Sequence, residues 1–348
     1  MTQASPGAHL WYTRCPIPTA FSLALHGGEL ERRLAPIGLH IESLRHSPDP
    51  AVRLSHFTHS LPGQTRHGGH IPPLWSRSEG RDIRLIGLSW ANEGQFVLVD
   101  RDSDLESLSA LKGRRLAVPR RARLPVDFWR ATVLRGYENA LATVNLSLSD
   151  VELVEIEVDQ DPFPQHRARS TEAPPGVPYQ TLTSQTAEGR ALVRREVDAI
   201  FSPAHYGVAL KSVIGARVLA DLSQLPDRFA KLNNFTLLAF TIDGAFLDRN
   251  PDAVTQLLRS AVEAAGRARE NPAEAARTVA AESGNAVDLV EDIFGEDFAA
   301  DLTPRLDDEI IEALTRQGRF LHAHGFIRRE VPIEEWIERG PLEAALKG

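Results

Sequence analysis

Short apolar runs typical of buried strands alternate with helical segments along most of this chain. The runs IRLIGLSW (83–90), QFVLVD (95–100) and RRLAVP (114–119) predict strands, and DFWRATVLRGYENAL (127–141) predicts a helix after them. Strands that alternate with helices are typical of an α/β fold. The Ala-rich segment 250–282 and the amphipathic segment 302–326 predict further helices near the C-terminus.

The order of these segments predicts two lobes. The chain leaves a first lobe near residue 112 and returns to it near residue 235, so residues 1–112 and 235–348 form one lobe and residues 113–234 the other. Segment 159–179, rich in proline and polar residues, is expected to be an irregular loop or insertion. A ligand would then sit in the cleft between the lobes, at the carboxyl ends of strands.

Composition narrows the possible functions. The 348 residues carry a formal net charge of -8, which argues against a nucleic-acid-binding surface. No apolar run approaches the roughly 20 residues that span a bilayer, and the N-terminal segment lacks the features of a secretory signal. A single cysteine cannot form an internal disulfide. We therefore expect a cytoplasmic protein that binds neither nucleic acid nor membranes. Many folds with two such lobes are monomeric, so we expect a monomer.

The one cysteine, Cys15, ends a predicted strand, LWYTRC (10–15), and precedes a predicted helix at 16–25 with Thr19 as a possible cap. A lone cysteine is most often a small buried apolar residue. A helix N-terminus, however, favours the reactive thiolate form of a nearby cysteine. The position therefore leaves a structural and a catalytic role open.

Residues 55–73, SHFTHSLPGQTRHGGHIPP, gather four histidines and one arginine in a stretch that we interpret as a loop. Arg66 precedes Gly68, Gly69 and a helix start at 71–74. Backbone amides of a Gly-Gly turn that enters a helix can bind an anion, and a guanidinium beside them can hold an oxyanion. His56 could serve Cys15 as a base or an ion-pair partner. A loop histidine bonded to backbone and a solvated arginine are the structural alternatives.

The spacing His-x-x-His occurs twice in this stretch, in His56/His59 and His67/His70, and could present two zinc ligands on one side of a turn. Glycine and proline break any helix that would orient the second pair, and no carboxylate stands close by to support the ligands. We therefore expect no metal.

Other cofactor signatures are missing from the sequence. It has no G-x-G-x-x-G after a strand, no P-loop and no G-x-S-x-G motif, so we expect no cofactor. Phe128 and Trp129 begin the helix predicted at 127–141, where aromatic side chains facing a cleft would suit a planar apolar ligand. Core packing explains the same two residues equally well.

Three segments together resemble the aromatic sulfinate desulfinases: YTRCPIPTAFSLA (12–24), HFTHSLPGQTRHGGHIPPLWS (56–76) and LTPRLDDEIIEALTRQGRFLHAHGFI (302–327). The resemblance runs from about residue 10 to about residue 336. Its most specific parts are the cysteine in C-P-[IV]-P and the HFT…TR-x-GG-x-IPPL block. It implies a two-lobed, type II periplasmic-binding-protein-like fold, and hydrolysis of the C–S bond of a small aromatic sulfinate to an arene and sulfite.

The resemblance also implies roles for individual residues. Cys15, His56 and Arg66 match the family's active site, with Cys15 as acid or nucleophile, His56 tuning it and Arg66 binding the sulfinate. The family's substrate-binding positions, which include a Gly-Gly turn and pocket aromatics, match Phe57, Gly68, Gly69 and Trp129.

This sequence departs from the family pattern at four positions, where aromatic or acidic residues are replaced by His59, Gln64, His67 and His70. The segment between Trp129 and Val151 is also shorter. These changes leave the three active-site positions intact but alter the pocket mouth, which would suit a smaller or differently substituted sulfinate. Three of the histidines, His59, His67 and His70, have no assigned role.

Three alternatives compete with a desulfinase. A solute-binding protein for a sulfonate or related oxyanion would use the fold, Arg66 and the glycines without chemistry, although the missing export signal and Cys15 argue against it. A protein like the thiamine-pyrimidine synthases would need a pyridoxal phosphate lysine and a Cys-rich motif, and neither is clear. A metal-binding sensor would rest on the histidines alone.

Overall fold

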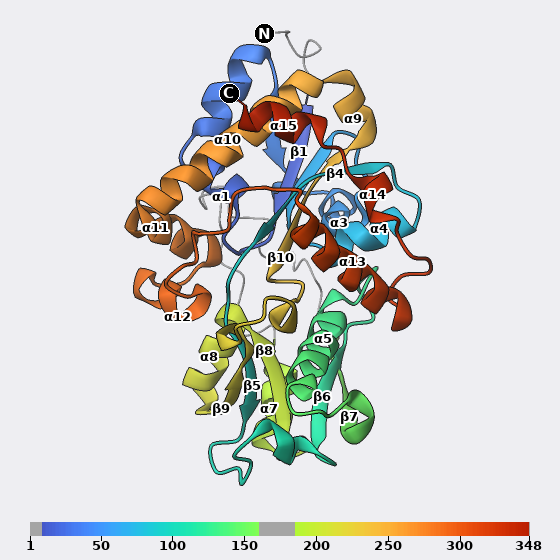
Figure 1. Cartoon of the computed structure of the whole chain (residues 1–348), viewed down its shortest axis with the longest axis vertical. Coiled ribbons are helices and arrows are strands. Elements are labelled where there is room, and N and C mark those ends of the chain that lie inside the picture. Colours follow the sequence, from blue (N-terminus) through green and yellow to red (C-terminus); the bar gives the residue numbers. More distant parts are fainter. Residues whose placement is uncertain (1–8, 160–184, 348) are drawn as a thin grey trace.

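Two five-stranded sheets form the framework of the protein, and they lie one beyond the other along the long axis of the molecule (Figure 1). The computed structural model describes residues 9–159 and 185–347, so all but the first residue of the loop expected at 159–179 lies outside the described residues. The described helices pack on the sheets, and both described ends of the chain lie at the same end of the molecule. The predicted two-lobed α/β fold is confirmed.

The first sheet holds the N-terminal strands and one strand from late in the sequence. Its spatial order is β2 (His40–Ser43), β1 (His9–Arg14), β3 (Gln64–Gly69), β10 (Leu237–Asp243) and β4 (Ile83–Trp90). Strand β1 runs parallel to β2 and β3, whereas β10 runs antiparallel between β3 and β4. The carboxyl ends of β1 and β3 therefore meet at one edge of the sheet.

Helices surround the first sheet (Figure 1). One group comprises α1 (Ala20–His26), α2 (Glu29–Leu34), α10 (Pro251–Glu270), α11 (Pro272–Ser283) and α15 (Gly340–Leu346). Within it, α10 packs against α1, α2 and α15, and α11 contacts α1. The remaining helices of this lobe are α3 (Pro50–Thr58), α4 (Ile71–Ser78), α9 (Gly244–Arg249), α12 (Val290–Phe294), α13 (Asp308–Ala323) and α14 (Ile333–Trp336).

The second sheet forms the lower lobe in Figure 1. Its order is β7 (Glu152–Glu157), β6 (Arg115–Arg120), β8 (Ala199–Pro203), β5 (Gln95–Val99) and β9 (Arg217–Asp221). Its described helices are α5 (Phe128–Ala142), α7 (Thr186–Val193) and α8 (Ala204–Ile214).

The chain crosses between the sheets earlier than the predicted division at residue 112. Strand β5 pairs with β8 and β9 of the second sheet, so the first crossing is at residues 91–94. The return crossing runs beside it, because the Ala91 N–H donates to the Thr236 carbonyl over 2.8 Å. The apolar run of β5 predicts a buried strand, but a strand's own sequence does not say which sheet it joins.

Residues 55–73 are not the loop that their glycines and histidines suggested. Helix α3 starts at Pro50, capped by Asp49, and ends at Thr58, with His59 as its C-cap at a φ of 48°. Strand β3 follows, with all six residues buried in the middle of the sheet. Its sequence, QTRHGG, has little intrinsic preference for a strand, so burial and pairing on both sides decide its structure.

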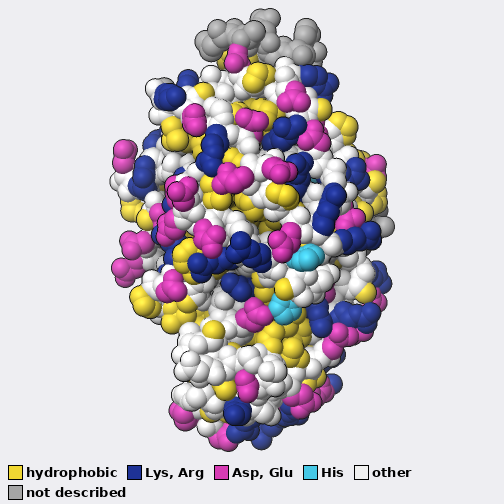
Figure 2. Space-filling view, turned by 45° about the vertical axis from the view of Figure 1, so that its right-hand side comes forward, with side chains coloured by type: hydrophobic (Ala, Val, Ile, Leu, Met, Phe, Trp, Pro, Cys, Tyr) yellow, Lys and Arg dark blue, Asp and Glu magenta, His cyan; other side chains and the backbone are white. Residues whose placement is uncertain are grey.

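The distribution of charged side chains and the character of the helices are consistent with the amino-acid composition. Acidic and basic side chains are interspersed over the face shown in Figure 2. Across residues 9–159 and 185–347, no helix combines the length and apolar character needed to cross a membrane.

Candidate active site

Cys15 follows directly on strand β1, at the edge of the sheet where β1 and β3 end. The register pairs Arg14 of β1 with His67 of β3, which places Cys15 level with Gly68. Helix α1 begins five residues later, at Ala20, and Thr19 caps it by accepting a hydrogen bond from the Ser22 amide. Cys15 is thus positioned by the end of a buried strand, as predicted, but does not lie in the first turn of the helix.

Arg66 connects the other two predicted active-site residues. Its side chain is only 1% exposed and extends from the middle of β3. One guanidinium nitrogen, Nη2, donates to Cys15 Sγ over 3.2 Å, and the other, Nη1, lies 3.0 Å from His56 Nε2. A buried guanidinium that faces a partly exposed sulfur is suited to bind an oxyanion or stabilise a thiolate.

His56 is held neutral in this arrangement. Burial, followed by the positive charges of Arg66 and Arg45, holds the pKa of His56 well below its ordinary value of 6.5. Nη1 of Arg66 lies 3.1 Å from Nδ1 and 3.0 Å from Nε2, and an arginine N–H can only donate, so the unprotonated ring nitrogen accepts from it. Nδ1 also lies 2.7 Å from Thr13 Oγ1, and the tautomer of His56 decides which of these two atoms donates. His56 therefore acts here as a neutral acceptor that orients Arg66.

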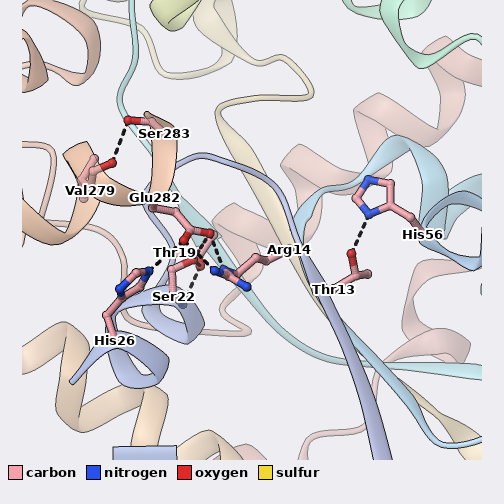
Figure 3. Close-up of polar contacts among 9 residues, drawn as sticks. All are labelled: Thr13, Arg14, Thr19, Ser22, His26, His56, Val279, Glu282 and Ser283. Atoms are coloured by element: carbon pink, nitrogen blue, oxygen red, sulfur yellow. Dashed lines mark hydrogen bonds and ion pairs between the residues drawn. The ribbon is translucent and has the colours of Figure 1, made fainter. Parts of the chain in front are cut away.

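Two neighbours of Cys15 on β1 point to opposite sides of the strand and fix it in place (Figure 3). Thr13 contacts His56, whereas Arg14 forms a buried ion pair with Glu282 of α11, with Nη2 and Oε2 2.7 Å apart. Burial alone would raise the pKa of Glu282, but the charge of Arg14 and a hydrogen bond from His26 hold it below its usual value. The strand end that carries Cys15 is thus held from both sides.

The two glycines of the site are strand residues rather than a turn. Gly68 and Gly69 pair with Ala239 and Leu238 of β10, and neither has a positive φ. They are needed because other groups come very close: a Cβ on Gly68 would lie 2.6 Å from Cys15 Sγ, and one on Gly69 2.7 Å from the Asn234 amide. The turn predicted here is wrong, and the lack of side chains is what the site requires.

Replacing Gly68 by alanine should displace Cys15. The added methyl group would push Sγ away from Arg66, and we expect a rate loss of roughly 10- to 100-fold in any reaction at Cys15, since about 1 Å of misplacement can cost this much. The matched control is Gly87→Ala on β4, which β10 separates from β3, and where a Cβ would lie 2.9 Å from Pro304. Both variants should lose stability in urea unfolding, but only Gly68→Ala should lose activity. Equal activities in the two variants would contradict this explanation of Gly68.

A pocket opens beside these residues. Its described lining consists of Cys15, Pro16, Ile17, Arg45, His56, Phe57, Arg66, Gly69, Pro72, Phe128, Tyr206, Asn234 and Phe235. Both lobes and the return crossing contribute to it, and none of these residues is acidic. A pocket with two arginines and several aromatic rings suits an anionic group attached to a planar apolar body.

The aromatic contacts differ in part from those predicted. Phe57 lines the pocket and stacks on Phe128, with ring centroids 5.7 Å apart. Trp129 is not among the lining residues: it is 3% exposed and packs edge-on against Tyr206 and Phe235. Consecutive residues of a helix point about 100° apart, so the first residue of α5 faces the pocket while the second supports its wall.

Seven of the described lining residues were not predicted as site residues, and four of them, Arg45, Tyr206, Asn234 and Phe235, lie outside the motifs that carry the resemblance. Arg45 and Tyr206 lie in segments with no recognisable motif, and Asn234 and Phe235 lie in the return crossing. Asn234 accepts a hydrogen bond from the Ile71 amide at the start of α4, over 3.0 Å, so the anion site predicted at this helix is partly occupied by an asparagine. Only the order of strands in the two sheets brings these segments together.

The remaining histidines of the 55–73 segment are buried structural residues. His59 Nδ1 lies 3.2 Å from the Phe57 carbonyl, and His70 Nδ1 lies 2.9 Å from the Leu237 carbonyl. His67 stacks on Phe240 of β10, with centroids 4.5 Å apart. Burial lowers the pKa of His59 and His67 to about 3 and that of His70 to about 4.

The four histidines of this segment do not form a cluster that could hold a metal. Within residues 9–159 and 185–347, the group with suitable geometry is His9, His40 and Glu42, on the neighbouring strands β1 and β2. These three residues are half-buried or exposed and lie at the start of β1, whereas Cys15 follows its end. The geometry thus gives no support to a zinc site at the pocket.

Comparison with known proteins finds relatives that match nearly the whole chain. The chain is 29% identical to 2'-hydroxybiphenyl-2-sulfinate desulfinase from Rhodococcus erythropolis, over 96% of this chain and 94% of that protein. The crystal structure of a cysteine-to-serine mutant of DszB in complex with biphenyl-2-sulfinic acid superposes with a TM-score of 0.77 and 26% identity, over 98% of this chain and 99% of that one. No family model matches the chain.

A wider group shares the fold. The periplasmic aliphatic sulphonate binding protein SsuA from Escherichia coli superposes with a TM-score of 0.66 and 16% identity, over 96% of this chain and 93% of that one. This similarity concerns the fold alone and confirms the periplasmic-binding-protein-like architecture. Over nearly its whole length, the chain is similar to 2'-hydroxybiphenyl-2-sulfinate desulfinase in both sequence and structure, as the sequence motifs predicted.

Proposed function

We propose that this protein is a desulfinase, which hydrolyses the C–S bond of an aryl sulfinate to release the arene and sulfite. The observation that carries the proposal is the contact of one buried guanidinium, Arg66, with both Cys15 and His56 in an aromatic pocket. The similarity to the sulfinate desulfinases supports the same reaction class, a carbon–sulfur hydrolase.

The pocket provides a separate place for each part of the substrate. Arg66 would hold the sulfinate oxygens by charge-assisted hydrogen bonds, with amides near Gly68 and Gly69 as further donors. Phe57 and Phe128 would pack against the aromatic ring. Cys15 would then lie beside the bond that breaks.

Two chemical routes use these groups. In the first, the Cys15 thiol protonates the ring carbon, SO₂ departs, and water converts it to sulfite. In the second, the Cys15 thiolate attacks sulfur, the C–S bond to the ring breaks as the ring carbon gains a proton, and water releases sulfite from the thiosulfonate-like intermediate on Cys15. His56, neutral and bonded to Thr13, keeps Arg66 in position in both routes. Closure of the two lobes would exclude bulk water.

Incubation of the purified protein with biphenyl-2-sulfinate and benzenesulfinate should release sulfite and the arene in equal amounts. In D₂O the arene should carry one deuterium at the carbon that held sulfur, because the ring carbon gains a solvent-derived proton. The control compound is the corresponding sulfonate, which should bind without reacting. Sulfite release would be followed with a thiol-reactive dye and the arene by chromatography.

The same experiment tests the alternative of an oxyanion-binding protein without catalysis, for which the shared fold provides the precedent. Thermal stabilisation by sulfinates and sulfonates alike, with no sulfite from any sulfinate, would reject the desulfinase and favour the binding protein.

A further inference from the structure

Three side chains on strands β1 and β2 form an outward-facing group away from the pocket. His9 of β1 pairs in register with His40 of β2, and Glu42 follows two residues later on β2. Register partners in parallel strands, and residues two apart along one strand, present their side chains on the same face of a sheet. The burial pattern agrees, because Leu10 and Tyr12, which alternate with His9, are buried. His40 and Glu42 are exposed.

The potential ligand atoms of this group lie close together. His9 Nε2 is 3.1 Å from Glu42 Oε2, and the ring centroids of His9 and His40 are 5.7 Å apart. One nitrogen of each histidine and one oxygen of Glu42 all lie within 4.8 Å of one another. Around a tetrahedral Zn²⁺ with bonds of about 2.1 Å, ligand atoms are roughly 3.4 Å apart. Small side-chain rotations at this exposed position therefore bring all three onto one ion.

A surface ion pair between His9 and Glu42 is the competing explanation. Exposed pairs of this kind contribute little to stability, and the pair leaves His40 without a role. Two protonated histidines opposite each other on neighbouring strands would also repel. A divalent ion uses all three side chains at once, and it accounts for the second histidine.

The ligand set selects the kind of ion. Two imidazole nitrogens and one carboxylate oxygen suit Zn²⁺ and the divalent ions of neighbouring transition metals, whereas Mg²⁺ and Ca²⁺ prefer oxygen ligands. Three protein ligands leave a fourth position on a tetrahedral Zn²⁺ for water. Neither His9 nor His40 belongs to the 55–73 segment, and their separation along the chain leaves no motif that reveals the group.

We propose that His9, His40 and Glu42 bind one divalent ion of the Zn²⁺ type, which ties strand β2 to β1. Strand β2 is four residues long and lies at the edge of the first sheet, where its one described neighbour is β1. An ion held by both strands stabilises this edge, because it binds the folded chain. Six residues of extended strand, about 20 Å, separate His9 from Cys15. The ion is therefore remote from the pocket, and the inference does not rest on the proposed function.

Calorimetric titration with ZnCl₂ at pH 7.5 tests the site in untagged, chelator-treated protein. Cys15→Ser serves as the parent, because the thiolate of the wild type is itself a zinc ligand. The parent should bind one ion per chain, and His40→Ala or Glu42→Gln should weaken binding by at least about tenfold, the loss that even an outer-shell change causes. The matched control is His324→Ala, which removes a surface histidine 2.7 Å from Glu138 and should leave the affinity unchanged.

Trp11 provides a second readout, which locates the ion. Its ring centroid lies 4.7 Å from that of His9. Cu²⁺ binds such ligands more tightly than Zn²⁺ does, and it quenches the fluorescence of a tryptophan at this range. Quenching in the parent should saturate at one equivalent of Cu²⁺. Trp11→Phe should lose this quenching while its affinity for Zn²⁺ stays the same.

Thermal melting shows whether each variant is folded and measures the effect of the ion on stability. Excess Zn²⁺ should raise the melting temperature of the parent by roughly 2–5 °C, and it should not do so in His40→Ala; Mg²⁺ should change neither. Equal Zn²⁺ affinities of the parent and His40→Ala, or full quenching in Trp11→Phe, would overturn the proposal. None of these measurements involves sulfite release, so their failure would leave the proposed desulfinase reaction untouched.

Discussion

Cys15→Ser should lower the rate of sulfite release from an aryl sulfinate by on the order of 10³-fold or more. A serine hydroxyl is a far weaker acid than a thiol and a weaker nucleophile than a thiolate, so both routes at Cys15 fail. Binding should survive, because Arg66 still presents its guanidinium to the pocket and the aromatic lining is unchanged. Sulfite release and ligand-induced thermal stabilisation, measured on the same preparation, check both halves of this prediction.

Chemical modification provides a matched test of Cys15 without mutagenesis. Because the sequence contains one cysteine, iodoacetamide can modify only this thiol. Alkylation should abolish turnover at the rate at which the thiol reacts, and a bound sulfinate should slow it. If Cys15→Ser kept more than about a tenth of the wild-type rate, Cys15 would be neither the acid nor the nucleophile, and the desulfinase proposal would lose its central residue.

How much of this site could be predicted differs from residue to residue. Cys15 could be placed at a strand end because LWYTR has the pattern of a strand and proline follows it. Arg66 and His56 could be singled out from the residues, but only the resemblance favoured a catalytic role over the structural alternatives, since QTRHGG contains no signal for a buried strand. The structure shows that β3 is buried by its neighbours on both sides, a contribution that propensity and periodicity do not include.

The site residues that were predicted wrongly or missed also depend on tertiary contacts, which the sequence pattern does not contain. Gly68 and Gly69 were expected in a turn, the commonest place for paired glycines, but here they make room for Cys15 and Asn234. Trp129 was expected in the pocket, but the position of Asp127 as N-cap sets the phase of α5 so that Phe128 lines the pocket. Arg45 and Tyr206 could not be found, because only the tertiary fold brings them to the site.

The histidines show how composition can suggest the wrong chemistry. Four of them within a short segment suggested metal ligands, yet three pack as neutral rings between strands and helices. Few histidine side chains reach the face shown in Figure 2. Burial, which the sequence does not reveal directly, converts this cluster from a possible binding site into a determinant of stability.

Buried neutral histidines make the fold sensitive to acid. His56, His59, His67, His70 and His205 are buried, and burial lowers the pKa of each. The folded-state pKa is about 3 for His59, His67 and His205 and about 4 for His70, against 6.5 for an unperturbed histidine. Below pH 6.5 the unfolded chain therefore binds more protons than the folded one, and stability falls as the pH falls.

The size of this effect decides whether the protein stays folded. Between pH 7.5 and 5.5 each such histidine removes about 1 kcal/mol from the free energy of unfolding, and the five together on the order of 5–7 kcal/mol. Glu93 acts in the opposite direction, because its raised pKa favours the folded state as the pH falls, and it offsets at most about 3 kcal/mol. The net loss is a large part of the roughly 5–15 kcal/mol that stabilises a typical domain.

Urea unfolding at pH 7.5, 6.5 and 5.5 should therefore show a fall of roughly 3–5 kcal/mol in the free energy of unfolding, with most of it below pH 6.5. The matched variant is His205→Met, since His205 is 1% exposed and, among the described residues, neither ring nitrogen has a hydrogen-bond partner. This variant should take up about one proton fewer on unfolding, so its stability should depend less steeply on pH. Equal stability of the wild type at pH 7.5 and 5.5 would show that the buried histidines bind protons in the folded state, and that the neutral His56 assigned to the site is wrong.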